Sequence, residues 1–184
     1  IITNSYKHSF FEKDKNIFIV RAGNIIGGGD WEKTRLIPDL FISNHKKKNI
    51  ILRNPQATRP WQHILDVTAG ILQLLLKKNK ISKKDNIYNI GPKKGGNIKV
   101  KSLITKFLYN SQLFKISYKF KKIKFKEKKY LSLSSNLILK DLKWSPKLTL
   151  NDTIRITSDW YFSFFKDKKK IFNFTKTQII NFFK

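Results

Sequence analysis

Short apolar runs rich in β-branched residues alternate along this chain with longer segments that have helical periodicity. Runs typical of buried strands lie at residues 16–21, 50–53, 86–90, 114–120 and 130–133. Segments with helical spacing lie at 34–48, 67–78, 100–110, 134–142 and from 151 or 152 to about 165, and residues 1–11 resemble the last turns of another helix. Because strands that alternate with helices build helix-covered sheets, the pattern predicts an α/β fold.

Local signals indicate where some of these elements begin. Asp66 is a suitable N-cap for the helix at 67–78, and Asn151 or Asp152 for the last long helix. Pro38 falls in the first turn of the helix at 34–48, where its missing N–H is tolerated. The glycines at 27–29 predict a loop, because glycine permits positive φ and close approach of the backbone to a ligand.

The basic composition does not by itself identify a polyanion as partner. The formal net charge is +27, yet lysines occur in nearly every segment, mostly at the ends of elements and in loops. Lys, Asn, Ile and Phe are enriched together, as a bias in base composition towards A and T produces. We therefore expect a solvated lysine surface and no nucleic-acid partner, with a true polyanion-binding surface as the alternative.

Several classes of site are excluded by what the sequence lacks. There are 0 cysteines, which excludes disulfides, thiolate metal sites and a cysteine nucleophile. The three histidines, His8, His45 and His63, lie far apart without metal-ligand spacing. No apolar run approaches the roughly 20 residues of a membrane span, and no signal peptide is visible. We expect a soluble cytoplasmic protein without a membrane partner or a metal.

The arginines are distributed differently from the lysines. Arg21, Arg35, Arg53 and Arg59 fall in one short stretch, residues 21–63, although the chain otherwise uses lysine. A planar guanidinium can grip a phosphate in a bidentate way that lysine cannot. An arginine at a strand end, a triple-glycine loop and an arginine at the next helix form an anion-binding arrangement, and an ordinary glycine turn with surface arginines is the alternative.

Two longer motifs in this stretch are more specific than any single residue. Residues 20–38 read VRAGNIIGGGDWEKTRLIP and residues 51–63 read ILRNPQATRPWQH. Both resemble the C-terminal half of the CDP-glucose 4,6-dehydratase family, within the extended short-chain dehydrogenase/reductase superfamily. The resemblance continues through YNIGP (88–92), YLSL (130–133) and LKWSP (142–146). The GGGDW and RNP…RPWQH patterns favour the CDP-glucose family over its dTDP-glucose and GDP-mannose relatives.

The resemblance implies a fold and a division of the chain. We expect the C-terminal part of a Rossmann-like fold with a small mixed α/β substrate-binding subdomain. Residues 1–165 would form this portion of the epimerase/dehydratase domain, and residues 166–184 a basic aromatic tail. The tail is expected to be a helical extension or a frayed end, with stacking of its phenylalanines on single-stranded nucleic acid as the alternative.

The resemblance also implies which residues bind the substrate: Asn24, Arg35, Leu36, Arg53, Arg59 and Asn97. Asn24 matches an asparagine that hydrogen-bonds the substrate diphosphate, and Arg59 matches the arginine that grips it. Arg35 and Leu36 match the start of a helix that closes over the nucleotide. Arg53 belongs to the strand that flanks the base. Asn97 resembles, more weakly, an asparagine that touches the substrate.

Other residues of the motifs have two interpretations. We expect His63 to pack or hydrogen-bond beside Trp61, with a role as general base as the alternative. Trp31 and Trp61 frame the pocket or belong to the core. Tyr130 is a further candidate for ligand contact. Just before it, the family usually has histidines where this chain has Lys126, Glu127, Lys128 and Lys129.

The chemistry implied by the resemblance needs residues that this sequence does not supply. Enzymes of the family oxidise the sugar at C4 with NAD, eliminate water across C5 and C6, and return the hydride to C6. They use a Tyr-x-x-x-Lys pair on a helix and a glycine-rich turn for the pyrophosphate. Neither motif occurs here in its required context.

We therefore expect the substrate-binding half of such a lyase, a fragment that binds CDP-glucose or a related nucleotide sugar without turning it over. The NAD is expected to be bound by an N-terminal half outside this sequence, and the full-length enzyme to form a homodimer. The resemblance implies a role in deoxysugar and lipopolysaccharide O-antigen synthesis. The alternatives are a non-catalytic basic module that binds nucleic acid or an anionic surface, and a non-functional remnant.

Overall fold

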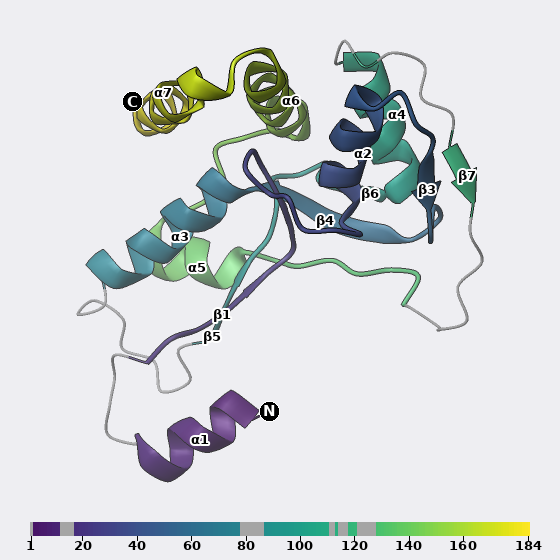
Figure 1. The fold of residues 1–184 in the computed structure, drawn as a ribbon. Coiled ribbons are helices and arrows are strands. Elements are labelled where there is room, and N and C mark those ends of the chain that lie inside the picture. Colours follow the sequence, from purple (N-terminus) through teal and green to yellow (C-terminus); the bar gives the residue numbers. More distant parts are fainter. Residues whose placement is uncertain (1, 12–16, 78–86, 111–112, 114–117, 121–127) are drawn as a thin grey trace.

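The computed structural model describes residues 2–11, 17–77, 87–110, 113, 118–120 and 128–184. Helices and strands alternate through most of this length, as the sequence predicts (Figure 1). In chain order the elements are α1 (Ile2–Phe10), β1 (Ile19–Ala22), β2 (Asn24–Ile26), α2 (Leu36–His45), β3 (Ile50–Leu52), β4 (Thr58–His63), α3 (Ile64–Leu76), β5 (Ile87–Ile90), β6 (Asn97–Lys99), α4 (Val100–Asn110), β7 (Tyr118–Phe120), α5 (Asn136–Leu142), α6 (Leu150–Lys166), the 3₁₀ turn η2 (Lys168–Lys170) and α7 (Ile171–Phe183).

The described strands form three small sheets. β1 pairs in parallel with β5, so that Ile19 lies opposite Ile87. β2 pairs in parallel with β4, and β4 pairs antiparallel with β6. β3 pairs in parallel with β7. Parallel pairing needs long crossover connections, and the helices of this chain supply them.

Two apolar cores hold the helices on these sheets. The larger core lies among α2, α4, α6 and the β2–β4–β6 sheet, and Phe41 stacks there on Tyr161 with ring centroids 4.4 Å apart. The smaller core joins α3 and α5 to the β1–β5 ladder through Tyr88, Ile90 and Trp144. The two cores explain why apolar runs at 50–53 and 86–90 are strands, since each places its alternate side chains in one core.

Three short features differ from the sequence-based expectation. A short strand that was not predicted, β2, follows β1 after Gly23 and pairs with β4. β4 was itself not predicted, since its TRPWQH sequence has no apolar alternation. The predicted strand at 130–133 is wrong: Tyr130 makes an isolated bridge to Thr58, and residues 131–133 are not paired as a strand. Residues 114–117 of the predicted strand at 114–120 lie outside the described residues.

Both predicted helix caps were placed wrongly. His63 is the N-cap of α3 and accepts a hydrogen bond from the backbone N–H of Leu65. Asp66 lies inside the first turn, where its carboxylate accepts from the backbone N–H groups of Lys147 (2.7 Å) and Leu148 (3.1 Å). In α6 the cap is Thr149, which forms a capping box with Asp152. The carboxylate of Asp66 thus bonds backbone outside α3, and that of Asp152 bonds the cap residue Thr149.

The residues after 165 form a helix that packs on α6. α6 ends at Lys166, and α7 follows the short η2 turn. The Trp160 indole N–H donates to the Thr175 hydroxyl (2.8 Å), and the Gln178 amide donates to the Ile156 carbonyl (2.9 Å). Phe182 is buried, whereas Phe172 is 76% exposed. One face of α7 therefore belongs to the fold and the other faces solvent.

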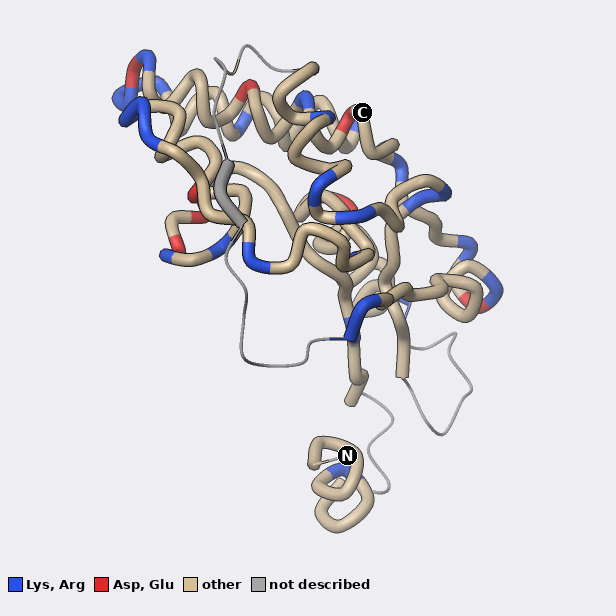
Figure 2. The backbone as a smooth tube through the Cα atoms, turned by 90° about the vertical axis from the view of Figure 1, so that its right-hand side faces the viewer, with Lys and Arg blue, Asp and Glu red and all other residues tan. Residues whose placement is uncertain are grey.

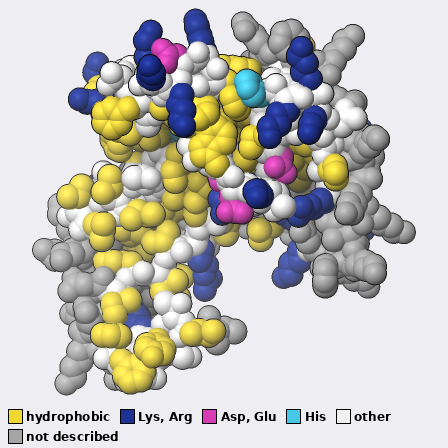
Figure 3. Space-filling view, viewed as in Figure 1, with side chains coloured by type: hydrophobic (Ala, Val, Ile, Leu, Met, Phe, Trp, Pro, Cys, Tyr) yellow, Lys and Arg dark blue, Asp and Glu magenta, His cyan; other side chains and the backbone are white. Residues whose placement is uncertain are grey.

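The surface has basic side chains in many places and apolar areas in others. Figure 2 shows lysines and arginines spread over loops and helix ends along the described chain, without gathering on one face. Figure 3 shows apolar side chains at the surface over α1 and α3. On α3 these are Ile64, Ile71, Leu72, Leu75 and Leu76, each at least partly open to solvent. No helix within the described ranges is long and apolar enough to cross a membrane.

We predict that Asp66→Ala lowers the free energy of unfolding by about 2 kcal/mol, because it leaves two backbone N–H groups without their acceptor. Urea denaturation of the purified chain measures this change. Asp159→Ala is the control, since the Asp159 carboxylate is 48% exposed and pairs with Arg155 only at 3.8 Å on the helix surface. Equal effects of the two substitutions would contradict the structural role of Asp66.

Candidate functional site

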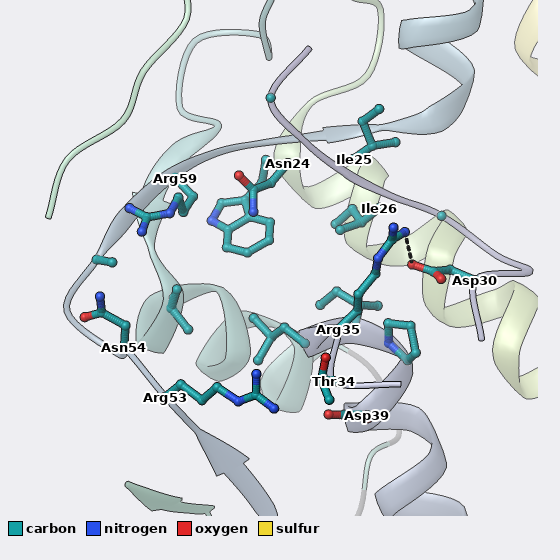
Figure 4. A pocket seen from close by; sticks show the side chains of 18 of the residues that line it. Asn24, Ile25, Ile26, Asp30, Thr34, Arg35, Asp39, Arg53, Asn54 and Arg59 are labelled. Carbon is teal, nitrogen blue, oxygen red and sulfur yellow. Dashed lines mark hydrogen bonds and ion pairs between the residues drawn. The ribbon is translucent and has the colours of Figure 1, made fainter. Parts of the chain in front are cut away.

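A cavity of about 520 Å³ lies where β2, the start of α2, the end of β3 and the start of β4 come together (Figure 4). Its lining combines charged, amide and apolar side chains. The lining residues with polar side chains are Asn24, Asp30, Thr34, Arg35, Asp39, Arg53, Asn54, Arg59 and Trp61. A cleft with convergent polar groups is a usual form of a small-molecule site, and this one is more polar than most.

Three arginines reach this cavity from three different elements. Arg35 immediately precedes α2, Arg53 follows β3, and Arg59 lies in β4, and Figure 4 shows them on separate sides of the cavity. Arg59 is held by its Nη1 atom, which donates to the carbonyls of Thr58 and Lys128, each at 2.9 Å. Arg35 pairs with Asp30, with 3.2 Å between Nη1 and Oδ2. Arg21 lies on the exposed side of β1, away from this lining.

Most of the sequence-predicted binding residues are brought together here. Asn24, Arg35, Leu36, Arg53 and Arg59 all line the cavity. Asn97 does not: it begins β6, lies opposite Pro60 in the antiparallel pair and is exposed. The shared lining makes joint contact of five of the six residues with one ligand geometrically possible.

Two carboxylates offset part of the arginine charge. Burial raises the pKa of Asp39, and the Thr34 backbone N–H and the positive charge of Arg53 partly oppose that rise. Asp30 accepts from the Glu32 backbone N–H at 3.0 Å in addition to its pair with Arg35. With three arginines against two carboxylates, the cavity wall keeps an excess of positive charge, which favours an anionic ligand.

The aromatic residues of the motifs divide between cavity and core. Trp61 is 5% exposed, lines the cavity and donates its indole N–H to the Ile98 carbonyl at 3.1 Å. Trp31 packs among Trp160, Tyr161 and other rings of α6, outside the lining. Tyr130 is 64% exposed, bridges Thr58 and lies outside the lining. Lys126 and Glu127 lie outside the described residues.

The triple glycine is a packing motif and not an open phosphate cradle. A Cβ on Gly28 would lie 2.0 Å from Cγ of Trp160, and one on Gly27 would lie 2.6 Å from Cγ2 of Ile64. Gly29 has φ +84°, which favours glycine. Because the Trp160 ring fills the space against the loop, the described residues do not fit the pyrophosphate of NAD at this loop.

Sequence reasoning missed one unusual residue of the site. Thr34 lines the cavity with φ 75°, a left-handed conformation that is rare for a β-branched residue. It lies directly before Arg35, so this backbone turn directs the start of α2 towards the cavity. No sequence signal announces it, since threonine has no preference for this conformation.

His63 is a structural residue, as the sequence predicts. It is 2% exposed, and its Nδ1 accepts from the Leu65 backbone N–H at 3.2 Å. Its Nε2 has no hydrogen-bond partner among the described residues. Burial lowers the pKa of His63 to about 4, so the ring is neutral at pH 7.

The comparisons with known proteins agree with this architecture. Residues 4–91 match the model of the NAD dependent epimerase/dehydratase family. The UDP-glucose-4-epimerase of Stenotrophomonas maltophila, solved with bound NAD and formylated UDP-arabinopyranose, is similar with a TM-score of 0.74 and 15% identity, over 90% of this chain and 54% of that chain. The dTDP-glucose 4,6-dehydratase of Bacillus anthracis, in complex with NAD, is similar with a TM-score of 0.73 and 18% identity, over 88% of this chain and 49% of that chain.

The class is thus an α/β protein with a Rossmann-like fold of the kind found in these epimerases and dehydratases, which confirms the predicted fold class. Among curated proteins, the CDP-glucose 4,6-dehydratase of Salmonella typhimurium is 41% identical over 78 residues, which are 39% of this chain and 22% of that protein. The predicted resemblance to this enzyme is confirmed. The chain spans about half the length of the two solved structures above.

Acid is predicted to destabilise the fold through His63. Its pKa is lower in the folded protein, about 4, than the 6.5 of the unfolded chain, so the unfolded state binds more protons between these values. This contribution to stability is complete above pH 6.5 and is lost as pH falls towards 4, by about 2 kcal/mol between pH 7 and pH 5.

Urea unfolding of the wild type and of His63→Asn at both pH values measures this loss. Asparagine keeps a side-chain acceptor at the N-cap but does not titrate. The loss of stability on acidification should be smaller in His63→Asn by about the same 2 kcal/mol. His45→Asn, which replaces an exposed histidine, should leave it unchanged. An equal loss in all three proteins would show that His63 titrates normally.

Gly28→Ala is predicted to lower the free energy of unfolding by about 3 kcal/mol, because the methyl group would overlap the Trp160 ring. Gly95→Ala is the matched control: Gly95 has φ +93° but nothing within 4 Å of an added Cβ, so only conformational strain of about 1 kcal/mol is expected. Thermal or urea unfolding compares the two. A tolerated alanine at residue 28 would contradict the packing of the loop.

Proposed function

We propose that this chain is the nucleotide-sugar binding portion of an NAD-dependent CDP-glucose 4,6-dehydratase, a lyase that acts in the cytoplasm. The proposal rests on one observation: a single cavity is lined by Arg35, Arg53 and Arg59 together with the Asn24 amide. Guanidinium groups on several sides can share the charge of a diphosphate, and an amide can bond the same oxygens. The similarity to the Salmonella enzyme supports CDP-glucose as the ligand.

The residues of the cavity suggest a division of labour. Arg59, whose Nη1 is held by two backbone carbonyls, directs its positive charge to the diphosphate. Asn24 faces the cavity from β2, the strand that pairs with β4 (Figure 4). Arg53 and Leu36 lie towards the α2 and β3 side, where they contact the nucleoside. Asn97 keeps a weaker assignment to the substrate, because its position at the start of β6 is outside the lining.

Catalysis is assigned to residues other than those of this cavity. The only Tyr-x-x-x-Lys spacing in the sequence joins Tyr118 to Lys122, and Tyr118 belongs to β7, a strand and not a helix. Together with the glycine loop filled by Trp160, this favours NAD binding and proton transfer by other parts of a longer enzyme. NAD, when bound there, would accept and return the hydride. This chain alone should bind the nucleotide sugar without converting it.

The proposal predicts that CDP-glucose binds the chain. Arg53→Ala and Arg59→Ala should each lower the affinity for CDP-glucose at least about tenfold, since each removes a charge-assisted contact. Isothermal titration calorimetry measures both. Arg155→Ala, on the outer surface of α6 and 62% exposed, is the matched control and should bind as the wild type does.

The same titration separates the proposal from a general polyanion-binding module. A random single-stranded oligonucleotide held only by lysines should lose affinity steeply between 50 and 200 mM salt, roughly as a power of the salt concentration. CDP-glucose should bind in 1:1 stoichiometry and lose far less. Tight oligonucleotide binding without CDP-glucose binding would refute the proposal. Conversion of CDP-glucose with NAD by the purified chain would refute the assignment of catalysis to other residues.

A further inference from the structure

Helix α6 contacts a residue of the cavity lining, Asp30, through a buried hydroxyl. The Tyr161 side chain is fully buried, and its ring stacks on Phe41 with 4.4 Å between centroids and 8° between planes. Its hydroxyl donates to the backbone carbonyl of Asp30 at 2.6 Å. Asp30 ends the glycine loop, so this bond joins segments that are 131 residues apart in the chain.

Asp30 in turn contacts the arginine that precedes α2. One carboxylate oxygen accepts from Nη1 of Arg35 at 3.2 Å, and the other accepts from the Glu32 backbone N–H at 3.0 Å. The dashed line in Figure 4 marks the Arg35 contact at the edge of the cavity. Backbone carbonyl and both carboxylate oxygens of Asp30 are therefore all engaged.

The ion pair alone would hold Arg35 only weakly. The Arg35 side chain is 64% exposed and that of Asp30 is 27% exposed, and pairs of this kind gain little because solvent screens them. The position of the guanidinium therefore depends on how firmly Asp30 itself is held. The adjacent contact of Trp160 with Gly28 holds the other end of the same loop. Two consecutive residues of α6 thus hold residues 28–30.

We infer that Tyr161 is a positioning residue for ligand binding, which fixes the Asp30 backbone so that the Asp30 carboxylate orients Arg35 towards a phosphate in the cavity. The inference rests on the proposed function, since it assumes a phosphate-bearing ligand. An arginine already oriented loses less rotamer entropy when the ligand binds. The role of α6 is then to set affinity without touching the ligand.

The chemistry of the Tyr161 hydroxyl suits a permanent donor. Burial raises its pKa above the ordinary value, and the negative charge of Asp30 raises it further. The hydroxyl therefore stays protonated across the physiological range and keeps donating to the carbonyl. The contact would not act as a pH switch.

Tyr161→Phe tests the inference because it removes the hydroxyl and keeps the ring stacked on Phe41. CDP-glucose affinity, measured by calorimetry, should fall about 3-fold to 10-fold, the size expected for the loss of one positioning hydrogen bond. Tyr88→Phe is the matched control, since the Tyr88 hydroxyl donates to Asp141 at 3.0 Å in the smaller core. Its affinity should equal that of the wild type.

A double-mutant cycle distinguishes positioning from general loosening of the fold. In an Arg35→Ala background, Tyr161→Phe should weaken CDP-glucose by less than about 2-fold, because its effect acts through the arginine. Asp30→Asn keeps the backbone carbonyl and loses the ion pair. Adding Tyr161→Phe to Asp30→Asn should therefore lower the affinity for CDP-glucose little further. Urea unfolding confirms that each variant is folded under the binding conditions.

The outcomes separate the inference from the proposed function. If the wild-type chain does not bind CDP-glucose, the proposed function fails. The positioning role is wrong if the wild type binds CDP-glucose and Arg53→Ala lowers the affinity, but Tyr161→Phe has the same affinity as Tyr88→Phe. The inference is also overturned if Tyr161→Phe lowers the affinity as much in the Arg35→Ala background as in the wild type. The Tyr161 hydrogen bond would then act on the fold and not on Arg35.

Discussion

The packing of Trp160 on Gly28 is the contact on which the arrangement of the C-terminal helices depends. The indole lies so close to the glycine backbone that no other residue fits there. Its N–H bonds Thr175, so the same ring also holds α7. Through this ring the last helices, the glycine loop and the β2 strand become one packed unit. A loop that sequence motifs associate with phosphate is, in this fold, a surface on which a helix rests.

Buried polar groups at the end of β4 join the two cores. The Gln62 amide donates to the Ile90 carbonyl at 2.8 Å and so connects β4 with the β1–β5 ladder. His63 caps α3, and Asp66 one turn later holds the chain that leads into α6. Each of these groups satisfies a backbone partner that apolar packing could not. The RPWQH motif with the following helix is thus a junction between layers, which explains its mixture of buried and polar residues.

Much of the fold was accessible from the sequence because apolar periodicity records which face is buried. α4 and the strands at 50–53 and 86–90 follow directly from such patterns. β4 was missed, because its burial comes from Trp61, Gln62 and His63, whose bonds to other segments leave no periodic signal. Asp66 and Asp152 were misassigned as caps for a related reason. A carboxylate near a helix start has several backbone groups within reach, and tertiary structure decides among them.

The candidate site, like the fold, was only partly predictable from the sequence. The arginines stood out against a lysine background, and the structure brings Arg35, Arg53 and Arg59 to one cavity. What sequence could not supply is the support behind them. Tyr161 lies 131 residues from Asp30, and Thr34 adopts a backbone conformation that its residue type disfavours. Long-range contacts and strained dihedrals leave no local pattern. Arg21 and Asn97 belong to the same motifs but lie outside the lining, so motif membership alone did not indicate which residues share the cavity.

Apart from Val100, every residue of the cavity lining lies between Gly23 and Trp61. Contacts that are close in sequence lose little chain entropy when they form, so this wall can assemble early and locally. The wall therefore comes almost entirely from one stretch of the chain, and the same stretch supplies Ile26, Ile37 and Trp61 to the larger core. Substitutions at these three residues would change the cavity and the packing together, whereas the lining arginines can be exchanged without removing a side chain from either core.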